Sequence, residues 1–335
     1  MSAHSSSGRP ADSILRSVSR SFYLSIRILP ARLREPVGLA YLLARTTDTI
    51  ADTAHNSREL RLQKLAQLSQ LIRGEDEPGG IVDLVGSFGP LQENVAERIL
   101  VESLPDFLSQ LNALDPADRD EVRALLQKIT RGQTLDLERF GGATQVRALA
   151  TAAELDEYTY LVAGCVGQFW TRLCFQHLRN FSRLSQEEML ALGKTYGMGL
   201  QLVNILRDVG SDLRAGRCYF PVAELAAVVL KPEQIVQQPE RFLPVYAKWL
   251  DKAATGLSAG RQYSLAVRNH RVRAATALPA LIGRRTLALL RDGGATILHR
   301  TIKVPRSEVR ALIAQLAITL ASRRVIEKMF REPSR

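Results

Sequence analysis

Apolar positions recur three and four residues apart along most of this chain, and the strict alternation typical of strands is scarce. The segments with helical period are residues 14–28, 30–52, 60–72, 91–111, 118–140, 151–177, 185–212, 239–269, 271–290 and 307–330. Residues 74–90 are rich in Gly, Pro and acidic side chains, so we expect a loop there. No internal repeat and no dividing linker is recognisable. The pattern predicts one all-α domain over residues 1–335, with a polar, Ser-rich start that is disordered over 1–11.

Two helix starts are marked by capping boxes, in which a Ser or Thr is followed three residues later by Glu. Thr151 with Glu154 begins one helix, and Ser185 with Glu188 begins another. Gly216 and Pro221 follow the second helix, which we therefore expect to end near residue 212.

The composition is that of an ordinary globular protein, with 46% apolar and 24% charged residues among 335. No run of about 18 apolar residues exists, so we expect no transmembrane anchor, and the polar start lacks the apolar core of a signal peptide. The three cysteines form no CxxC pair and fit reduced thiols better than a zinc site. We therefore expect a cytoplasmic protein.

The positive charge is concentrated near the C-terminus. Residues 261–331 contain 15 Lys and Arg against 3 Asp and Glu, a net charge of +12, whereas the whole chain has +11. Nucleic acid, anionic lipid and phosphorylated substrates are all candidate partners for such a segment. The chain has no recognisable nucleic-acid-binding motif, so we expect peripheral membrane contact through residues 261–331 and no nucleic acid.

Asp48 and Asp52 are four residues apart and therefore share one face of a predicted helix. Like charges at this spacing cost a helix about 0.2–0.5 kcal/mol, a cost that a bound cation would remove. Arg45 precedes Asp48 by one turn, and the surrounding residues are apolar, so the pair should be partly buried. A lone DxxxD is a weak signal, and a solvated helix face remains the alternative.

The second acidic cluster is more specific. Asn204, Asp208 and Asp212 are spaced by four residues, so three oxygen donors share a helix face, and Arg207 adjoins Asp208. Carboxylate and amide oxygens together with water and substrate phosphate are the ligands that Mg²⁺ prefers. The two clusters together predict magnesium sites that hold a diphosphate. A structural network of ion pairs is the alternative for this cluster.

Two further segments carry candidate chemistry. The helix over 156–173 contains Tyr158 and other aromatic residues, which form either plain core or a surface that stabilises a carbocation. Gly164 and Gly167 on it allow another helix or a ligand to approach closely. Ser19 and Ser21 offer hydroxyls near a helix start, which taken alone is a capping or surface feature.

These motifs in this order resemble the squalene/phytoene synthase family over about residues 19–290. The matching blocks are Ser19-Arg-Ser-Phe22, Tyr41-Leu-Leu-Ala-Arg45-Thr-Thr-Asp48-Thr-Ile-Ala-Asp52, Tyr158-Thr-Tyr-Leu-Val-Ala-Gly164, Gln201-Leu-Val-Asn204-Ile-Leu-Arg207-Asp208-Val-Gly-Ser-Asp212 and Gly216-Arg-Cys-Tyr-Phe-Pro221. Asp48-Thr49 and the 268–287 segment are more similar to bacterial squalene synthases. The 216–221 block is more similar to phytoene and dehydrosqualene synthases. The resemblance implies the isoprenoid synthase fold, with helices around a central apolar cavity.

The resemblance also implies a role for each matching residue. The expected catalytic residues are Tyr158, Asp48, Asp52, Asp208, Asp212, Arg45 and Arg207. The expected Mg²⁺ ligands are Asp48, Asp52, Asn204, Asp208 and Asp212. The residues expected to contact the substrate are Ser19, Ser21, Phe22, Tyr41 and Gln201, and those expected to contact the cofactors are Asn204 and Arg217.

The activity that the resemblance implies is a head-to-head condensation of two farnesyl diphosphates to presqualene diphosphate, followed by NADPH-dependent reduction to squalene. The sequence does not give the oligomeric state, and we expect a monomer. The rivals are a phytoene or dehydrosqualene synthase and an enzyme that stops at presqualene diphosphate. A terpene cyclase and a non-catalytic family member are further alternatives. The four Asp residues argue against the last, and Arg45 with the 19–22 block argues against the cyclase.

Overall fold

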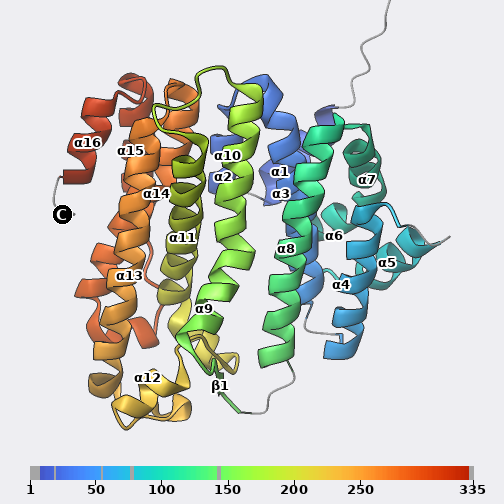
Figure 1. Cartoon of the computed structure of the whole chain (residues 1–335). Helices are drawn as coiled ribbons and strands as arrows, with labels where there is room; N and C mark the ends of the chain where they lie inside the picture. The colour runs from blue at the N-terminus through green and yellow to red at the C-terminus, as the bar shows by residue number, and fades with distance from the viewer. Residues whose placement is uncertain (1–7, 19, 54–55, 76–78, 142–144, 332–335) are drawn as a thin grey trace, which may run out of the picture. The chain divides into compact units, whose positions relative to one another are not determined.

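The computed structural model describes residues 8–18, 20–53, 56–75, 79–141 and 145–331 (Figure 1). Almost all of them are helical, as the sequence pattern predicts, and they divide into two compact units, residues 1–137 and 138–335. None of the helices in the described ranges is long and apolar enough to cross a membrane. The prediction of a single domain stays a prediction, and each unit is described on its own.

The first unit is built from eight helices of the described chain. They are α1 (Gly8–Val18), α2 (Arg20–Arg27), α3 (Ala31–Asp52), α4 (Arg58–Arg73), α5 (Gly80–Phe88), α6 (Val95–Glu102), α7 (Leu104–Ala113) and α8 (Pro116–Phe140), the last of which continues into the second unit. The helix α3 packs against α4, α6 and α7, and its apolar residues are buried. The position of α3 in this packing determines where its acidic face lies.

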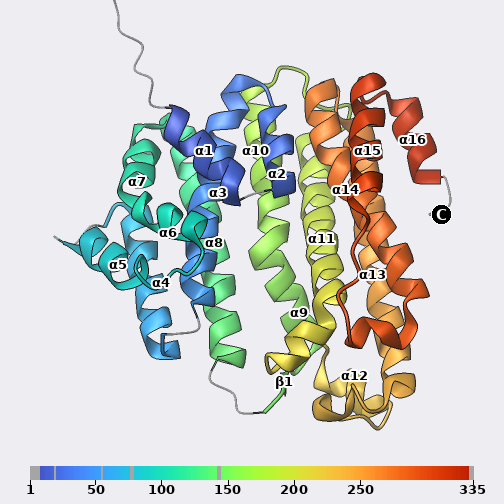
Figure 2. The same cartoon turned by 180° about the vertical axis from the view of Figure 1, so that it is seen from behind.

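The second unit contains the longest helices. Its elements are β1 (Arg147–Ala148), α9 (Ala152–Thr159), a π-helix (Tyr160–Gly164), α10 (Cys165–His177), α11 (Gln186–Arg214), β2 (Arg217–Cys218), α12 (Val222–Ala227), a 3₁₀ turn (Pro232–Gln234), α13 (Pro239–Ala266), α14 (His270–Asp292), a 3₁₀ turn (Gly294–Leu298), α15 (Arg306–Ile318) and α16 (Arg323–Arg331). The helices α10, α11, α13 and α14 pack together, with α11 against α10 and α13, and α14 against both α11 and α13 (Figures 1 and 2).

Several predicted boundaries were wrong. Residues 80–88, expected as a loop, form α5, which begins after Gly79 at φ +87° and buries Leu84 and Phe88 completely. Residues 91–111 form two helices because the chain breaks at Ser103, and 307–330 form two because of a turn after residue 318. Residues 14–28 fall in α1 and α2, and residues 8–11 of the expected disordered start form the first turn of α1.

Gly164 and Gly167 were expected to admit either a helix or a ligand, and the structure places α11 against both. A Cβ on Gly167 would lie 1.9 Å from the carbonyl oxygen of Gly193 in α11. Only the absence of side chains at this crossing lets the two backbones touch. The close packing of α10 on α11 is therefore encoded by Gly167 and Gly193, and it fixes α11 against its neighbours.

The capping box at Ser185 is complete, because its hydroxyl accepts from the Glu188 amide and the Glu188 carboxylate accepts from the Ser185 amide. At Thr151 the hydroxyl accepts from the Glu154 amide, but the Glu154 carboxylate accepts from the Ala150 amide instead. Both predicted helix starts are confirmed, and α11 ends at Arg214, two residues beyond the expectation.

Candidate active site

The helix α3 presents one polar face in an otherwise buried segment. Thr46, Thr47 and Thr49 are buried, and their hydroxyls donate to carbonyl oxygens three or four residues earlier in the same helix at 2.7–3.0 Å. The helix thus satisfies its own threonines. In the second half of the helix, the polar groups of Arg45, Asp48 and Asp52 are therefore the ones available for contacts outside the helix.

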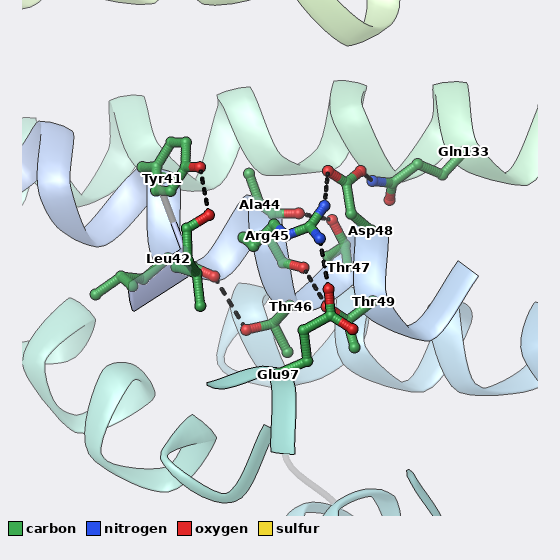
Figure 3. Close-up of polar contacts among 11 residues, drawn as sticks. Tyr41, Leu42, Ala44, Arg45, Thr46, Thr47, Asp48, Thr49, Glu97 and Gln133 are labelled. Carbon is green, nitrogen blue, oxygen red and sulfur yellow. Dashed lines mark hydrogen bonds and ion pairs between the residues drawn. The ribbon is translucent and has the colours of Figure 1, made fainter. Parts of the chain in front are cut away.

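Arg45 lies between two carboxylates (Figure 3). Its Nη2 donates to Glu97 Oε1 of α6 at 2.7 Å, and its Nη1 lies 3.6 Å from Asp48 Oδ2. The contact with Asp48 one turn away confirms the spacing argument from the sequence. Glu97 was missed, because it lies 52 residues from Arg45 in the chain and nothing in its local sequence marks it.

Gln133 is a second residue that the sequence did not indicate. It is 7% exposed on α8, and its amide Nε2 donates to Asp48 Oδ1 in a short hydrogen bond (Figure 3). Its Oε1 is buried and has no hydrogen-bond partner among the described residues. Gln133 therefore fixes the orientation of the Asp48 carboxylate and still offers an acceptor oxygen beside it.

The ionisation of Asp48 is strongly perturbed. Burial raises the pKa of this carboxyl to about 6, the charge of Asp52 adds to the rise, and Arg45 and Gln133 oppose it. The side chain is nevertheless 48% exposed, so protein surrounds the carboxyl without covering it. A perturbed carboxyl that a ligand can still reach is typical of a functional site. Asp52 itself is exposed at the end of α3.

In the second unit α11 carries the other cluster. Arg207 holds Asp208 through two hydrogen bonds, from Nε to Oδ1 at 3.1 Å and from Nη2 to Oδ2 at 2.5 Å. About a third of each side chain is exposed. Asn204 is exposed one turn earlier and donates to Gln201 Oε1 at 3.3 Å. The predicted sharing of one helix face is confirmed for these side chains.

Asp212 is joined to the short two-stranded sheet. Arg217 of β2 donates from Nη2 to Asp212 Oδ1 at 2.9 Å, and β2 is held by parallel pairing with β1. Asp212 is 14% exposed, so it is the most enclosed carboxylate of the α11 cluster. Arg217, expected to contact a cofactor, is thus placed beside an expected metal ligand.

Tyr158 on α9 stacks on Tyr219, with ring centroids 5.2 Å apart and planes inclined by 23°. Tyr219 meets Phe140 edge to face at 5.1 Å, and both are buried. Tyr158 remains half-buried. The π-helix that begins two residues after Tyr158 is an irregularity often found at functional sites. Tyr219 and Phe140 were not predicted as site residues, although Tyr219 stacks on the Tyr158 ring and Phe140 packs against Tyr219.

The remaining predicted residues are on α2 and α3. Tyr41 is half-buried, its hydroxyl donates to the Val18 carbonyl at 3.4 Å, and burial raises its pKa. Ser21 and Phe22 lie in α2, but their side chains, like the whole of Ser19, lie outside the described residues. Their expected contacts with substrate stay predictions.

The residues present fit a divalent cation and a phosphate group. Within the described ranges no three His, Cys, Asp or Glu side chains gather to enclose a metal ion. Mg²⁺ retains several waters and uses one or two carboxylates plus substrate phosphate, so two Asp in each cluster suit it. The unpartnered Gln133 Oε1 suits a proton of metal-bound water, and the buried Arg45 Nε, also without a described partner, suits a phosphate oxygen.

Comparison with known families gives a match to the squalene/phytoene synthase model over residues 15–308. The chain belongs to this family, and the resemblance read from the motifs is confirmed. The family name covers both squalene and phytoene synthases, so the match alone does not choose between them.

Individual relatives include both kinds. The chain is 31% identical over 249 residues to a bifunctional lycopene cyclase/phytoene synthase of Leptosphaeria maculans, covering 73% of this chain and 40% of that protein. It is 28% identical over 224 residues to a squalene synthase of Yarrowia lipolytica, covering 66% of this chain and 47% of that protein. The chain thus spans less than half the length of these relatives.

The solved structures confirm the fold. The structure of TcSQS with the ligand E5700 superposes with a TM-score of 0.75 at 20% identity, covering 98% of this chain and 93% of that one. The all-α isoprenoid synthase fold predicted from the sequence is therefore confirmed.

Proposed function

We propose that this protein is a Mg²⁺-dependent prenyltransferase that joins two farnesyl diphosphates head to head to form presqualene diphosphate. We further propose that it reduces this intermediate with NADPH to squalene. Family membership supports the reaction class. The observation that carries the proposal is that α3 and α11 each present two carboxylates four residues apart. In each helix the first carboxylate is paired with an arginine: Asp48 with Arg45, and Asp208 with Arg207.

The chemistry calls for such groups. Departure of diphosphate from an allylic carbon develops negative charge on oxygen and positive charge on carbon. The guanidinium groups of Arg45 and Arg207 bind phosphate oxygens, and the Asp side chains of both clusters hold the metal ions. Mg²⁺, when bound, supplies positive charge to the departing diphosphate.

Condensation forms two carbon–carbon bonds of a cyclopropane ring, releases one diphosphate and gives up one proton. In the proposal the Tyr158 hydroxyl relays this proton to water or to the departing diphosphate, and its ring stabilises the neighbouring carbocation. The stack of Tyr158 on Tyr219 fixes the ring plane for both tasks. In the second step a hydride from NADPH replaces the second diphosphate.

Three parts of the proposal come from the family resemblance or from the charge of the sequence. They are the C15 chain length of the substrate, the contacts of Arg217 and Asn204 with cofactors, and the peripheral membrane contact of residues 261–331. The alternative activity, a phytoene or dehydrosqualene synthase, is favoured by the bifunctional phytoene synthases among the relatives. In that case both diphosphates leave without a reductant.

The test is to incubate the purified protein with farnesyl diphosphate and Mg²⁺, with and without NADPH, and to identify the products by mass spectrometry. We expect presqualene diphosphate without NADPH and squalene with it. A C30 hydrocarbon with a conjugated triene, formed without NADPH, would support the dehydrosqualene alternative. No C30 product under either condition, and no C40 product from geranylgeranyl diphosphate, would refute head-to-head synthesis.

Substitutions test the two clusters. Asp48→Asn in one unit and Asp208→Asn in the other should each reduce turnover by at least a hundredfold while the helical content is unchanged. The matched controls are Asp83→Asn and Asp251→Asn, since these exposed carboxylates pair with Lys64 and Arg291 outside the clusters. Full turnover in both cluster variants would contradict the metal assignment.

A further inference from the structure

One end of the second unit gathers four arginines that have no acidic partner in the part of the chain that the structure describes. We define the arginine cluster as Arg183, Arg268, Arg273 and Arg323. They come from the connection before α11, the connection after α13, the first turn of α14 and the first residue of α16. Residues distant in the sequence thus bring like charges together.

A small backbone bridge builds the cluster. Ser182 pairs antiparallel with Val267, the Arg183 amide donates to the Ala266 carbonyl at 3.0 Å, and the Arg268 amide donates to the Phe181 carbonyl at 2.8 Å. This bridge fixes the α10–α11 connection to the end of α13. Two of the four arginines are therefore rigidly placed by the main chain.

The other two arginines meet at one carbonyl. Arg273 Nη1 and Arg323 Nη2 both donate to the Val267 oxygen, at 2.8 and 2.9 Å, so their guanidinium groups lie within a few ångströms of each other. Their other hydrogen bonds among the described residues, and the hydrogen bond of Arg268 to Ser182, are with carbonyl oxygens too. Neutral carbonyls orient these groups without cancelling their charge, and burial together with the neighbouring arginines lowers the pKa of Arg273 and of Arg323.

Of the acidic side chains near the cluster in sequence, Glu187 is exposed in the first turn of α11, and two others are already engaged. Glu188 completes the capping box at Ser185, and Glu327 accepts from Arg261 at 2.8 Å and from Arg331 at 3.1 Å. The exposed Arg183 and Arg268 and the half-buried Arg323 therefore present a net positive surface. Such a positively charged surface attracts anions from outside the protein.

Two large apolar side chains project beside the cluster. Ile318, the last residue of α15, is 82% exposed, and Leu320 in the turn that follows is 67% exposed. Leu320 and Ala321 have φ of +48° and +49°, a conformation that non-glycine residues rarely adopt. The turn is held in place because the buried Ala321 accepts from Arg273 Nε at 2.6 Å and donates to the Leu316 carbonyl at 2.8 Å.

We propose that the arginine cluster together with Ile318 and Leu320 is a membrane-docking face that binds the phosphate groups of anionic lipids and inserts its two apolar side chains among them. Arginines beside exposed apolar residues match the interface of an anionic bilayer, where phosphate lies next to hydrocarbon. This inference specifies the membrane contact of the proposed function and does not depend on the reaction catalysed.

The face is separate from the acidic cluster of the same unit. It includes the residues just before the first turn of α11, whereas Asp208 lies about 35 Å further along that helix at 1.5 Å per residue. Figures 1 and 2 both show the α10–α11 connection and α16 at one end of this unit and α12 at the other. Docking through this face leaves the acidic end of α11 away from the lipid.

The test measures co-sedimentation of the full chain with vesicles of phosphatidylcholine alone and with 30% phosphatidylglycerol added. We expect binding to the anionic vesicles only, and its loss at 1 M salt, where the Debye length falls to about 3 Å. Arg183→Gln with Arg268→Gln should weaken binding about thirtyfold, from about 1 kcal/mol for each arginine. Ile318→Ser with Leu320→Ser should weaken it at least tenfold.

Two matched double variants serve as controls. Val82→Ser with Val229→Ser removes equally exposed apolar side chains elsewhere, and Arg32→Gln with Lys231→Gln removes the same charge from other exposed positions. Both should bind like the unchanged protein. The Ile318/Leu320 variant should also keep full turnover of soluble substrate, which separates this test from that of the proposed function.

Several results would overturn the proposal. They are equal binding to neutral vesicles, no vesicle binding at all, and unchanged binding in both docking variants with their helical content intact. Displacement from vesicles by 10 mM inorganic phosphate would instead assign the cluster to a free anion. Binding to DNA through the same residues, without binding to vesicles, would assign it to nucleic acid.

Discussion

The substitution Asp48→Asn should stabilise the metal-free protein while it abolishes turnover. The pKa of Asp48 is about 6 in the folded protein and 3.8 without perturbation, so the folded state binds the proton more tightly than the unfolded chain does. This contribution to stability is complete below pH 3.8 and is lost as the pH rises through 6. At pH 8 the ionised Asp48 therefore destabilises the fold, and the neutral amide of the variant would not.

The expected magnitude follows from the size of the shift. Two pKa units correspond to about 3 kcal/mol. Because 48% of the side chain is exposed, solvent screens the effect, and we expect about 1 kcal/mol at pH 8. The introduced asparagine keeps an oxygen that accepts from Gln133 Nε2, so the packing around the site should not change.

The assay is urea unfolding followed by circular dichroism in EDTA at pH 4 and at pH 8. The difference between variant and unchanged protein should be near zero at pH 4 and about 1 kcal/mol in favour of the variant at pH 8. Asp83→Asn is the matched control with the opposite sign, because the hydrogen bond from Lys64 lowers the pKa of Asp83. A variant that is less stable at pH 8, or equally stabilised at both pH values, would refute the reasoning.

Three further outcomes are expected. Gln133→Leu removes a hydrogen bond that lowers the pKa of Asp48, so the acidic limb of the pH–rate profile should move to higher pH; an unmoved limb would separate Gln133 from the site. Tyr219→Leu removes two ring contacts and should cost about 2 kcal/mol of unfolding free energy together with a fall in kcat, measured by denaturation and steady-state kinetics. Gly167→Ala should cost at least about 2 kcal/mol because its Cβ meets the Gly193 carbonyl, whereas Gly86→Ala, with open space around it, should stabilise α5 by up to about 1 kcal/mol.

The predictable parts of the site are contacts between residues close together in the same helix. Arg45 and Asp48 are three residues apart and share a helix face, and Arg207 adjoins Asp208 in the sequence. Both contacts could therefore be expected from the sequence, and both are present. Helix boundaries were predicted less well where a turn contains no Gly or Pro to mark it, as at Leu320. The Gly, Pro and acidic residues of 74–90 predict a loop, although Leu84 and Phe88 within this stretch are spaced for burial on one helix face.

The supporting residues were not predictable, for a physical reason. Gln133 and Glu97 reach the α3 cluster from 85 and 52 residues away, and they do so only after α8 and α6 have packed. The same holds for the arginine cluster. The sequence showed an excess of charge over residues 261–331, but Arg183 joins it only through the bridge between Ser182 and Val267.

The central claim is tested most directly by the ratio of inorganic diphosphate released to farnesyl diphosphate consumed, measured with Mg²⁺ in the absence and presence of NADPH. Head-to-head condensation with a separate reductive step predicts one diphosphate for every two substrates without NADPH, and one for each substrate with it. The C30 products should account for all of the carbon. A ratio of one without NADPH and only C15 products would contradict the account, because a single farnesyl group would then be ionised and never joined to a second.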